Sequence, residues 1–489
     1  MAIPSIGGSE SPRQQHRHKT LGHNLDIFSV RRPFACCGEK DSLYKKPMRL
    51  NCSCFVFHAL AVVAFTSMDV CHAQQRSGPP SFAVSPDKSN GVYQVGETIR
   101  WRIEATGTNA ALSAHYSLKK GEMVEVAQGD LMLTNGIAEL ESKADAPGHL
   151  MLEVRPSVTG GRGSRVLGGV IIAPEKITLS APRPADFDSF WDGKLKEMKQ
   201  VPARAKLERA EAGRTNIEYW KIMMDNIGGT HVYGQIARPA QGQKFPALLI
   251  LQWAGVYSLK PNWVTDRAAQ GWLALDIEPH DMAIDAGSGG APGNYASVGN
   301  DDRDKSYFLR MYLSCYQAAR YLTQRPDWNG QTLVVMGDSM GGQQSLVIAG
   351  LFPKITAALA LVPSGCDTLG PESGRREGYP GWYDNAGGKD PRKVHEASRY
   401  FDTANFTARI QGQVLVAFGL LDETSPPTGV LAAFNQIKSP KQMLILTRSP
   451  HQDAGGAQAP YRHLRDDVWL PALKEGKRPP VNPVEMSAF

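Results

Sequence analysis

The sequence predicts a small all-β region followed by a larger α/β domain with a mainly parallel sheet. Three observations support this prediction. Within residues 98–154, short segments alternate apolar and polar residues, whereas from about residue 177 buried-strand patterns alternate with helical ones. The third observation is a glycine-flanked serine, Ser339, between an apolar run and a helical stretch. The length of 489 residues suits two or three domains.

The first 73 residues are predicted to be removed rather than folded. Basic residues precede the apolar run at 55–65, and Cys71-His72-Ala73 supplies the small residues that a signal peptidase recognises. The run is shorter than the ~20 apolar residues of a membrane span, so we expect a secretory signal without a stable membrane anchor. Because a signal of normal length begins at Met48, residues 1–47 are interpreted as an upstream extension. The expected location is secreted or periplasmic.

The charge and cysteine content exclude several classes of protein. Residues 1–73 hold nine Lys/Arg and five Asp/Glu, so the net charge of +6 falls to about +2 for the remainder, which argues against a nucleic-acid partner. Beyond residue 73 only Cys315 and Cys366 remain. Two distant cysteines make neither a disulfide framework nor a metal site, so we expect two buried thiols, with a single bridge as the alternative.

Residues 80–176 are predicted to form an immunoglobulin-like β-sandwich. Ile99, Trp101 and Ile103 lie on one face of a strand, and residues 124–126, 137–140 and 150–154 show the same alternation. A structural or oligomer-forming role is expected, and a sugar-binding module is the alternative.

Residues 177–489 are predicted to form the α/β domain. Phe187, Phe190 and Trp191 have helical spacing, and Asp186 is a candidate N-cap. Strands are then expected at 232–236, which is antiparallel, and at 247–251, 272–276, 333–336, 357–362, 414–418 and 443–446, with a helix at 310–320.

The motif Gly337-Asp338-Ser339-Met340-Gly341 predicts a nucleophile elbow. A strand, a sharp turn and a helix place the serine at the apex, and a side chain at 337 or 341 would collide with neighbouring elements. An ordinary turn is the alternative, because such strings also occur by chance.

Two further strand ends carry matching chemistry. Asp422 follows the strand at 414–418, and His451 follows the strand at 443–446. Nucleophile, acid and histidine in this order, each after its own strand, are typical of the α/β-hydrolase fold. Glu423 is the alternative acid and His463 the alternative histidine.

This triad predicts ester hydrolysis through an acyl-enzyme. His451 would accept the Ser339 proton, and Asp422 would orient the imidazole and stabilise its cation. The oxyanion needs two donors: the backbone N–H of Met340, and one from the loop after residue 251, where Ala254 and Trp253 are the candidates.

Three segments resemble the acetyl xylan esterase and cephalosporin C deacetylase family: residues 184–191, 337–342 and 419–427. The similarity extends over about residues 177–475. It implies α/β-hydrolase serine esterases that remove acetyl groups from xylan, xylo-oligosaccharides and related esters, that need no cofactor and that often form homo-oligomers. It also implies Ser339, Asp422 and His451 as the catalytic triad.

The chain departs from the family pattern near the predicted pocket. Gln252-Trp253-Ala254 stands where the family has His-Gly-Tyr, Glu278-Pro279-His280-Asp281 replaces Arg-Gly-Gln-Gly, and Met340 replaces Gln. Esterase chemistry is therefore better supported than acetyl specificity.

An insertion at 364–399 contains Tyr379, Trp382 and Tyr383, which are candidates for stacking on sugar rings, with packing of the loop as the alternative. We expect a secreted esterase acting on an acetylated carbohydrate. A feruloyl, glucuronoyl or lactone hydrolase, and a non-catalytic glycan-binding protein on a hydrolase fold, are the alternatives.

Overall fold

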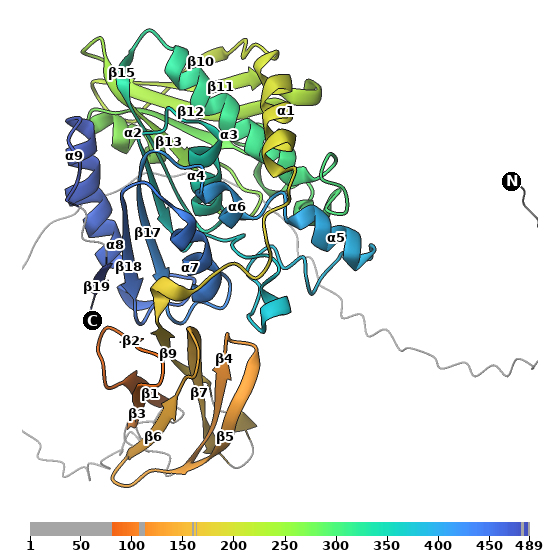
Figure 1. The fold of residues 1–489 in the computed structure, drawn as a ribbon. Coiled ribbons are helices and arrows are strands. Elements are labelled where there is room, and N and C mark those ends of the chain that lie inside the picture. Colours follow the sequence, from red (N-terminus) through yellow and green to blue (C-terminus); the bar gives the residue numbers. More distant parts are fainter. Residues whose placement is uncertain (1–80, 107–112, 159–160, 163, 481–483, 488–489) are drawn as a thin grey trace, which may run out of the picture. The chain divides into compact units, whose positions relative to one another are not determined.

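The computed structural model describes residues 81–106, 113–158, 161–162, 164–480 and 484–487 (Figure 1). The predicted signal segment, residues 1–73 with Met48, lies outside these described residues. Within them the strands form sheets of three, six and ten members. None of the helices in this part of the chain combines the length and the hydropathy that a bilayer crossing requires.

Strands β1–β9 form the two smaller sheets, in the orders β1-β3-β6 and β2-β9-β7-β4-β5, with β8 paired to β7. Their bounds are β1 (Ser81–Pro86), β2 (Val92–Tyr93), β3 (Thr98–Thr106), β4 (Ser113–Lys120), β5 (Val124–Met132), β6 (Ile137–Lys143), β7 (Gly148–Val158), β8 (Gly161–Arg162) and β9 (Val166–Ile172). Ile99, Trp101 and Ile103 on β3 are fully buried in one apolar cluster, as their alternation predicts. We call residues 81–172 the N-terminal β region; the domain boundaries 80–176 and the immunoglobulin-like class stay predictions.

Strand β5 differs from the sequence prediction. Val124 and Val126, expected on a buried face, are 46% and 51% exposed. The physical reason is the unequal width of the two sheets. Strand β5 is the edge of the six-stranded sheet, and the three-stranded sheet is too narrow to cover it.

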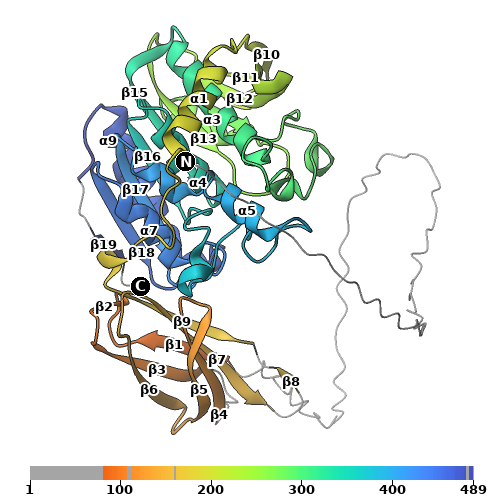
Figure 2. The same ribbon diagram turned by 45° about the vertical axis from the view of Figure 1, so that its right-hand side comes forward.

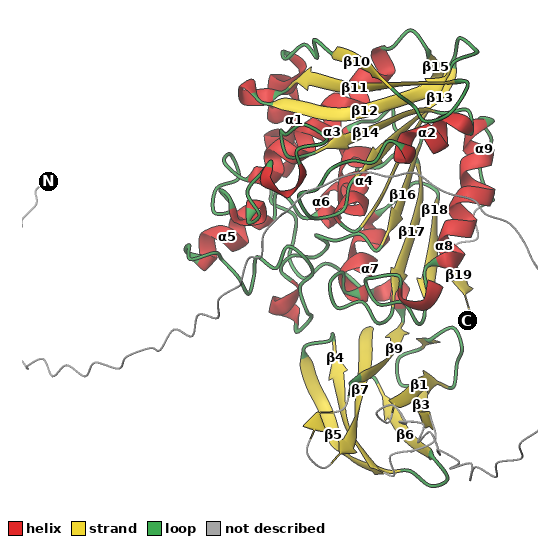
Figure 3. Cartoon of the chain, turned by 180° about the vertical axis from the view of Figure 1, so that it is seen from behind, coloured by secondary structure: helices red, strands yellow, loops and turns green. Residues whose placement is uncertain are grey.

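The ten-stranded sheet has the order β10-β11-β12-β14-β13-β15-β16-β17-β18-β19. From β10 to β14 neighbouring strands are antiparallel, and from β14 to β19 they are parallel, as Figure 3 illustrates for β16, β17 and β18. The bounds are β10 (Lys206–Ala210), β11 (Ile217–Asp225), β12 (His231–Pro239), β13 (Phe245–Leu251), β14 (Leu273–Glu278), β15 (Trp328–Asp338), β16 (Ala357–Leu361), β17 (Gln413–Gly419), β18 (Lys441–Leu446) and β19 (Val484–Ser487). The central strands are continuous apolar runs because both faces of a parallel sheet are covered.

Helices cover both faces of this sheet (Figure 2). One apolar core contains side chains of α1, α3, α4, α6 and α7, and the other contains side chains of α2, α8 and α9. The bounds are α1 (Phe187–Lys199), α2 (Asn262–Ala269), α3 (Tyr307–Gln324), α4 (Met340–Leu351), α5 (Pro391–Ser398), α6 (Thr403–Thr407), α7 (Pro427–Gln436), α8 (Ala459–His463) and α9 (Leu470–Lys474). Parallel strands beneath two helical layers bring the carboxyl ends of β13, β15, β17 and β18 to one edge of the sheet.

Helix α1 forms where the aromatic spacing predicts it, with Phe187 and Trp191 fully buried. Asp186 precedes this helix but its side chain does not cap it, contrary to the prediction. The carboxylate instead accepts hydrogen bonds from Arg303, at 2.6 Å, and from the Tyr400 hydroxyl. The Arg303 guanidinium and the Tyr400 hydroxyl thus bind the Asp186 carboxylate in place of a backbone N–H of the first helical turn.

Candidate active site

Ser339 occupies a strained turn between β15 and α4. Its φ of 57° and ψ of −121° are values that residues with side chains rarely adopt. The Ser339 N–H donates to the Leu361 carbonyl of neighbouring β16 at 2.9 Å. A Cβ atom at Gly341 would lie 2.1 Å from the Leu251 carbonyl oxygen, so only glycine fits there. The turn thereby places the serine at the carboxyl edge of the sheet.

The structure brings the three predicted triad side chains into one hydrogen-bonded chain. Ser339 Oγ lies 2.9 Å from His451 Nε2. On the other side of the ring, His451 Nδ1 lies 2.9 Å and 3.1 Å from the two carboxylate oxygens of Asp422. A carboxylate can only accept from Nδ1–H, so the neutral ring has its lone pair on Nε2, facing the serine hydroxyl.

The acid is held by its own loop. Asp422 is fully buried, and its Oδ1 accepts hydrogen bonds from the N–H groups of Thr424, at 2.9 Å, and Ser425, at 2.7 Å. Glu423, the alternative acid, forms ion pairs with Arg165 and Arg376 instead of contacting His451. The geometry therefore favours Asp422.

The histidine loop is joined to the acid loop and to the next helix. The Leu421 N–H donates to the Ser449 carbonyl at 3.1 Å, and Gln458 Nε2 donates to the His451 carbonyl at 3.0 Å. His463, the alternative histidine, lies at the end of α8, is largely exposed and pairs with Asp467. Gln458 was missed by the sequence analysis because no motif marks it.

Three backbone donors are available for an oxyanion. The register of β13 and β15 places Leu251 opposite Gly337, so the loop after β13 lies beside the elbow. Among the described residues, no acceptor pairs with the N–H groups of Met340, Ala254 or Trp253. Met340 begins α4, where the first N–H groups have no partner within the helix.

A buried polar network holds the loop that carries the second candidate donor. The Gly255 carbonyl accepts from His280 Nε2 at 2.8 Å, and the Gly255 N–H donates to the Tyr295 hydroxyl at 3.1 Å. Since Nε2 carries the hydrogen, Nδ1 accepts from the Tyr307 hydroxyl at 3.1 Å. Burial lowers the pKa of His280 to about 4, which keeps the ring neutral, as this arrangement requires.

The same loop is fixed at Gln252, whose Nε2 donates to Asp276 on β14 at 2.5 Å. Burial raises the pKa of Asp276 to about 7. Burial, and secondly the charge of Asp276, raises the pKa of Glu278 to about 8. The sequence signal for this network was the segment Glu278-Pro279-His280-Asp281, which follows the predicted strand at 272–276 and to which the sequence assigned no role.

Trp382 is not available for sugar stacking, contrary to the hypothesis drawn from the sequence. Only 2% of its surface is exposed, and its ring packs edge-on against Phe308 with 4.8 Å between centroids. Its Nε1–H donates to the Ala296 carbonyl at 2.8 Å. The side chain fixes the insertion to the body of the domain, which is the packing alternative.

The other two aromatic candidates are partly buried. The hydroxyls of Tyr379 and Tyr295 lie 2.7 Å apart, and the latter donates to Met340 Sδ at 3.6 Å. Tyr383 stacks on His395 with 4.2 Å between centroids. Tyr379 thus reaches the elbow through Tyr295, whereas Tyr383 is occupied by a neighbour.

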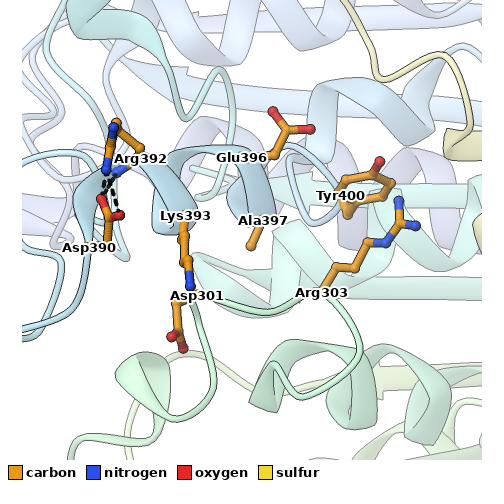
Figure 4. Close-up of a pocket in the computed structure, with 8 residues that line it drawn as sticks. All are labelled: Asp301, Arg303, Asp390, Arg392, Lys393, Glu396, Ala397 and Tyr400. Carbon is orange, nitrogen blue, oxygen red and sulfur yellow. Dashed lines mark hydrogen bonds and ion pairs between the residues drawn. The ribbon is translucent and has the colours of Figure 1, made fainter. Parts of the chain in front are cut away.

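A cavity of about 520 Å³ lies between α5 and the segment around Asp301 (Figure 4). None of the triad residues lines it. Several of its charged side chains have partners: Asp390 pairs with Arg392, as the dashed lines in Figure 4 mark, and Arg303 pairs with Asp186. This cavity is therefore separate from the triad.

Cys315 and Cys366 are both free and buried, which confirms the expectation of two buried thiols. Within the described part of the chain, no group of three or more His, Cys, Asp or Glu side chains is arranged to hold a metal ion.

Comparisons with known proteins identify the family. The family model described as acetyl xylan esterase matches residues 176–465. An acetyl esterase of Xylanibacter ruminicola, Axe7A, is 30% identical over 387 residues, which cover 75% of this chain and 85% of the relative.

Two solved structures share the fold. The acetyl xylan esterase 1 of Thermoanaerobacterium sp. JW/SL YS485 is 25% identical, with a TM-score of 0.53, and covers 59% of this chain and 96% of its own. The acetyl xylan esterase of Paenibacillus sp. R4 is 23% identical, with a TM-score of 0.52, and covers 60% of this chain and 98% of its own. The region from α1 onward therefore has the fold of α/β-hydrolase esterases, and the chain belongs to the acetyl xylan esterase family and is a carboxylic ester hydrolase.

Proposed function

We propose that the protein is a secreted serine esterase that removes acetyl groups from xylan, xylo-oligosaccharides or related glycans through an acyl-enzyme on Ser339. The observation that carries this proposal is the continuous contact from Ser339 Oγ through His451 to Asp422, with 2.9 Å at each step. The match to the acetyl xylan esterase family model and the similarity to a solved acetyl xylan esterase support the substrate class.

The proposed reaction has two halves. In the first, His451 Nε2 takes the hydroxyl proton while Ser339 Oγ bonds to the acetyl carbon. The tetrahedral intermediate then collapses, its bond to the sugar oxygen breaks, and His451 passes the proton to that oxygen. In the second half, water attacks the acetyl-enzyme with the same proton transfers, which releases acetate and restores the serine.

The oxyanion of each intermediate would accept from the Met340 N–H and from the loop after β13. We assign the second donor to Ala254, with Trp253 as the alternative, because the elbow and this loop follow adjacent parallel strands. Removal of one such donor costs about 3–4 kcal/mol of transition-state stabilisation in serine hydrolases.

The test of the nucleophile compares the wild type, Ser339→Ala and the exposed control Ser373→Ala with p-nitrophenyl acetate. We expect activity to fall about 10⁴-fold or more in Ser339→Ala and to be unchanged in the control. Mass spectrometry of a rapidly quenched reaction should find acetyl on the peptide that contains Ser339. Equal rates of the wild type and Ser339→Ala would refute the proposal.

The substrate is tested separately by measuring acids released from acetylated xylan, acetylated xylo-oligosaccharides, feruloylated arabinoxylan and glucuronoyl esters. We expect acetate to dominate. Faster release of ferulate or of a glucuronate would leave the serine mechanism intact and replace the substrate. N-terminal sequencing of protein from the medium or periplasm tests secretion, and the expected first residue is Gln74.

A further inference from the structure

The loop that carries the catalytic acid is held from the N-terminal β region. His149 lies on β7 and is fully buried, and its Nε2 donates to the Leu420 carbonyl at 3.0 Å. Strand β9 approaches the same carbonyl, because a Cβ atom at Gly169 would lie 2.2 Å from the Leu420 oxygen. Two strands therefore fix a carbonyl that lies two residues before Asp422.

The second ring nitrogen of His149 faces a buried carboxyl group. Its Nδ1 lies 3.2 Å from Oε1 of Glu122, which follows β4 and has 1% of its side chain exposed. Neither oxygen of Glu122 makes a hydrogen bond of good geometry with a described residue, and His149 is its partner at ion-pair distance.

The contact between Glu122 and His149 is compatible with two protonation states of the pair. Since a carbonyl can only accept, Nε2 of His149 carries a hydrogen, and the ring is either neutral beside a neutral Glu122 or an imidazolium beside an ionised one. In both cases the pair has no net charge. Burial raises the pKa of Glu122, and the nearby charge of Asp422 raises it further, although His149 and Arg376 oppose them.

The residue after the acid is held from the same region. Glu423 forms an ion pair with Arg165, which lies between β8 and β9, and a second with Arg376 at 3.4 Å. The Arg376 N–H in turn donates to the Gly121 carbonyl at 2.8 Å. Residues on both sides of Asp422 thus contact the β region, while the hydrogen bonds of Asp422 itself are with Thr424, Ser425 and His451 of the larger domain.

We propose that Glu122 and His149 are positioning residues for the catalytic acid: through the Leu420 carbonyl they keep Asp422 in line with His451. The proposal rests on the proposed function of the triad and gives the N-terminal β region a role in catalysis. The titratable and charged side chains that face this loop are Glu122, His149, Glu153 and Arg165 from the β region, and Arg376, Asp422, Glu423 and His451 from the larger domain.

The test removes and then restores the donor to Leu420. His149→Phe fills a similar volume without a donor, whereas the amide of His149→Gln places an N–H near the position of Nε2. With p-nitrophenyl acetate we expect kcat of His149→Phe to fall about 10- to 100-fold, the loss that a displacement of roughly 1 Å causes, with KM within about twofold. His149→Gln should recover most of the kcat.

A pH profile separates positioning from folding. A weaker Asp422 contact stabilises the His451 imidazolium less, so the acid limb of kcat/KM should move to lower pH in His149→Phe and return in His149→Gln. The control is His115→Phe, a half-exposed histidine of the same region that pairs with Asp130, and it should leave kcat and the profile unchanged.

If His149→Phe does not fold, Arg165→Gln gives the decision, because this half-exposed side chain contacts the acid loop through Glu423, while its other partner, Glu153, lies on β7. A drop of about two- to fivefold in kcat with a lower acid limb supports the proposal. Unchanged kcat and profile, or a lower melting temperature as the only effect, overturns it. Ser339→Ala, measured in parallel, distinguishes failure of the two proposals. Full activity of Ser339→Ala would refute the proposed function. An inactive Ser339→Ala together with a His149→Phe variant that behaves as wild type would refute only the positioning role.

Discussion

The buried carboxyl of Glu278 should make the stability of the protein fall as the pH rises. Its side chain is 2% exposed, and burial, with the charge of Asp276 as the second cause, raises its pKa from 4.5 to about 8. In the unfolded chain the group titrates near its ordinary value. Below about pH 4.5 both states are protonated and the full stability is present, and it is lost as the pH rises toward 8, where the folded state must ionise a buried group.

The magnitude follows from the two pKa values. Between them the free energy of unfolding should fall by about 1.4 kcal/mol per pH unit, or about 4 kcal/mol from pH 5 to pH 8. Glu278→Gln keeps a neutral side chain of the same shape at every pH. The difference in unfolding free energy between the variant and the wild type should therefore grow with pH and become constant above about pH 8.

Urea unfolding followed by tryptophan fluorescence at half-unit steps from pH 5 to pH 9 measures this difference. Glu139→Gln, on the exposed side of β6, is the matched control and should give a flat curve. A flat curve for Glu278→Gln as well would refute the reasoning, because it would mean that the carboxyl ionises in the folded protein as readily as in water.

Three further outcomes are expected. Asp422→Asn should lower kcat about 10³- to 10⁴-fold with little change in KM, because the amide favours the wrong imidazole tautomer, while Asp130→Asn, measured in the same esterase assay, should have no effect. Gly341→Ala should lower the free energy of unfolding by about 3 kcal/mol or more, since its Cβ would collide with the Leu251 carbonyl; an unchanged melting temperature would contradict the elbow packing. Trp382→Ala should cost about 3–5 kcal/mol of stability in urea unfolding, and weaker binding of xylo-oligosaccharides at unchanged stability would restore the stacking hypothesis.

The sequence predicted the triad geometry because that geometry follows from topology. Ser339 comes directly after β15, Asp422 and His451 lie in the loops that follow β17 and β18, and parallel strands bring their carboxyl ends to one edge of a sheet. The spacing between them along the chain is irrelevant once the strands are recognised. Fold and triad were therefore accessible to pattern analysis without knowledge of any side-chain contact.

Contacts between distant segments were not accessible in this way. Asp186 has the residue type and place of an N-cap, but Arg303 and Tyr400 bind its carboxylate from more than 100 residues away. Trp382 has the surroundings of an exposed loop aromatic, but a gap beside Phe308 on α3 accommodates it. In both cases tertiary packing overrides a local preference, and a single sequence carries no signal for it.

The loop after β13, where the chain departs from the family pattern, is held by a polar network of its own. The chain lacks the His-Gly-Tyr segment after its first buried parallel strand, and the replacement residues are Gln252, Trp253 and Ala254. In their place, Gln252 binds Asp276, while His280 binds the carbonyl of Gly255, so the loop is fixed by β14 and the segment after it. A loop fixed at both ends of the Trp253-Ala254 pair can present a backbone N–H to an oxyanion whatever its side chains are, because the donor belongs to the main chain. The side chains are then free to vary with the substrate, and Trp253, 44% exposed at this edge of the sheet, is where such variation would act.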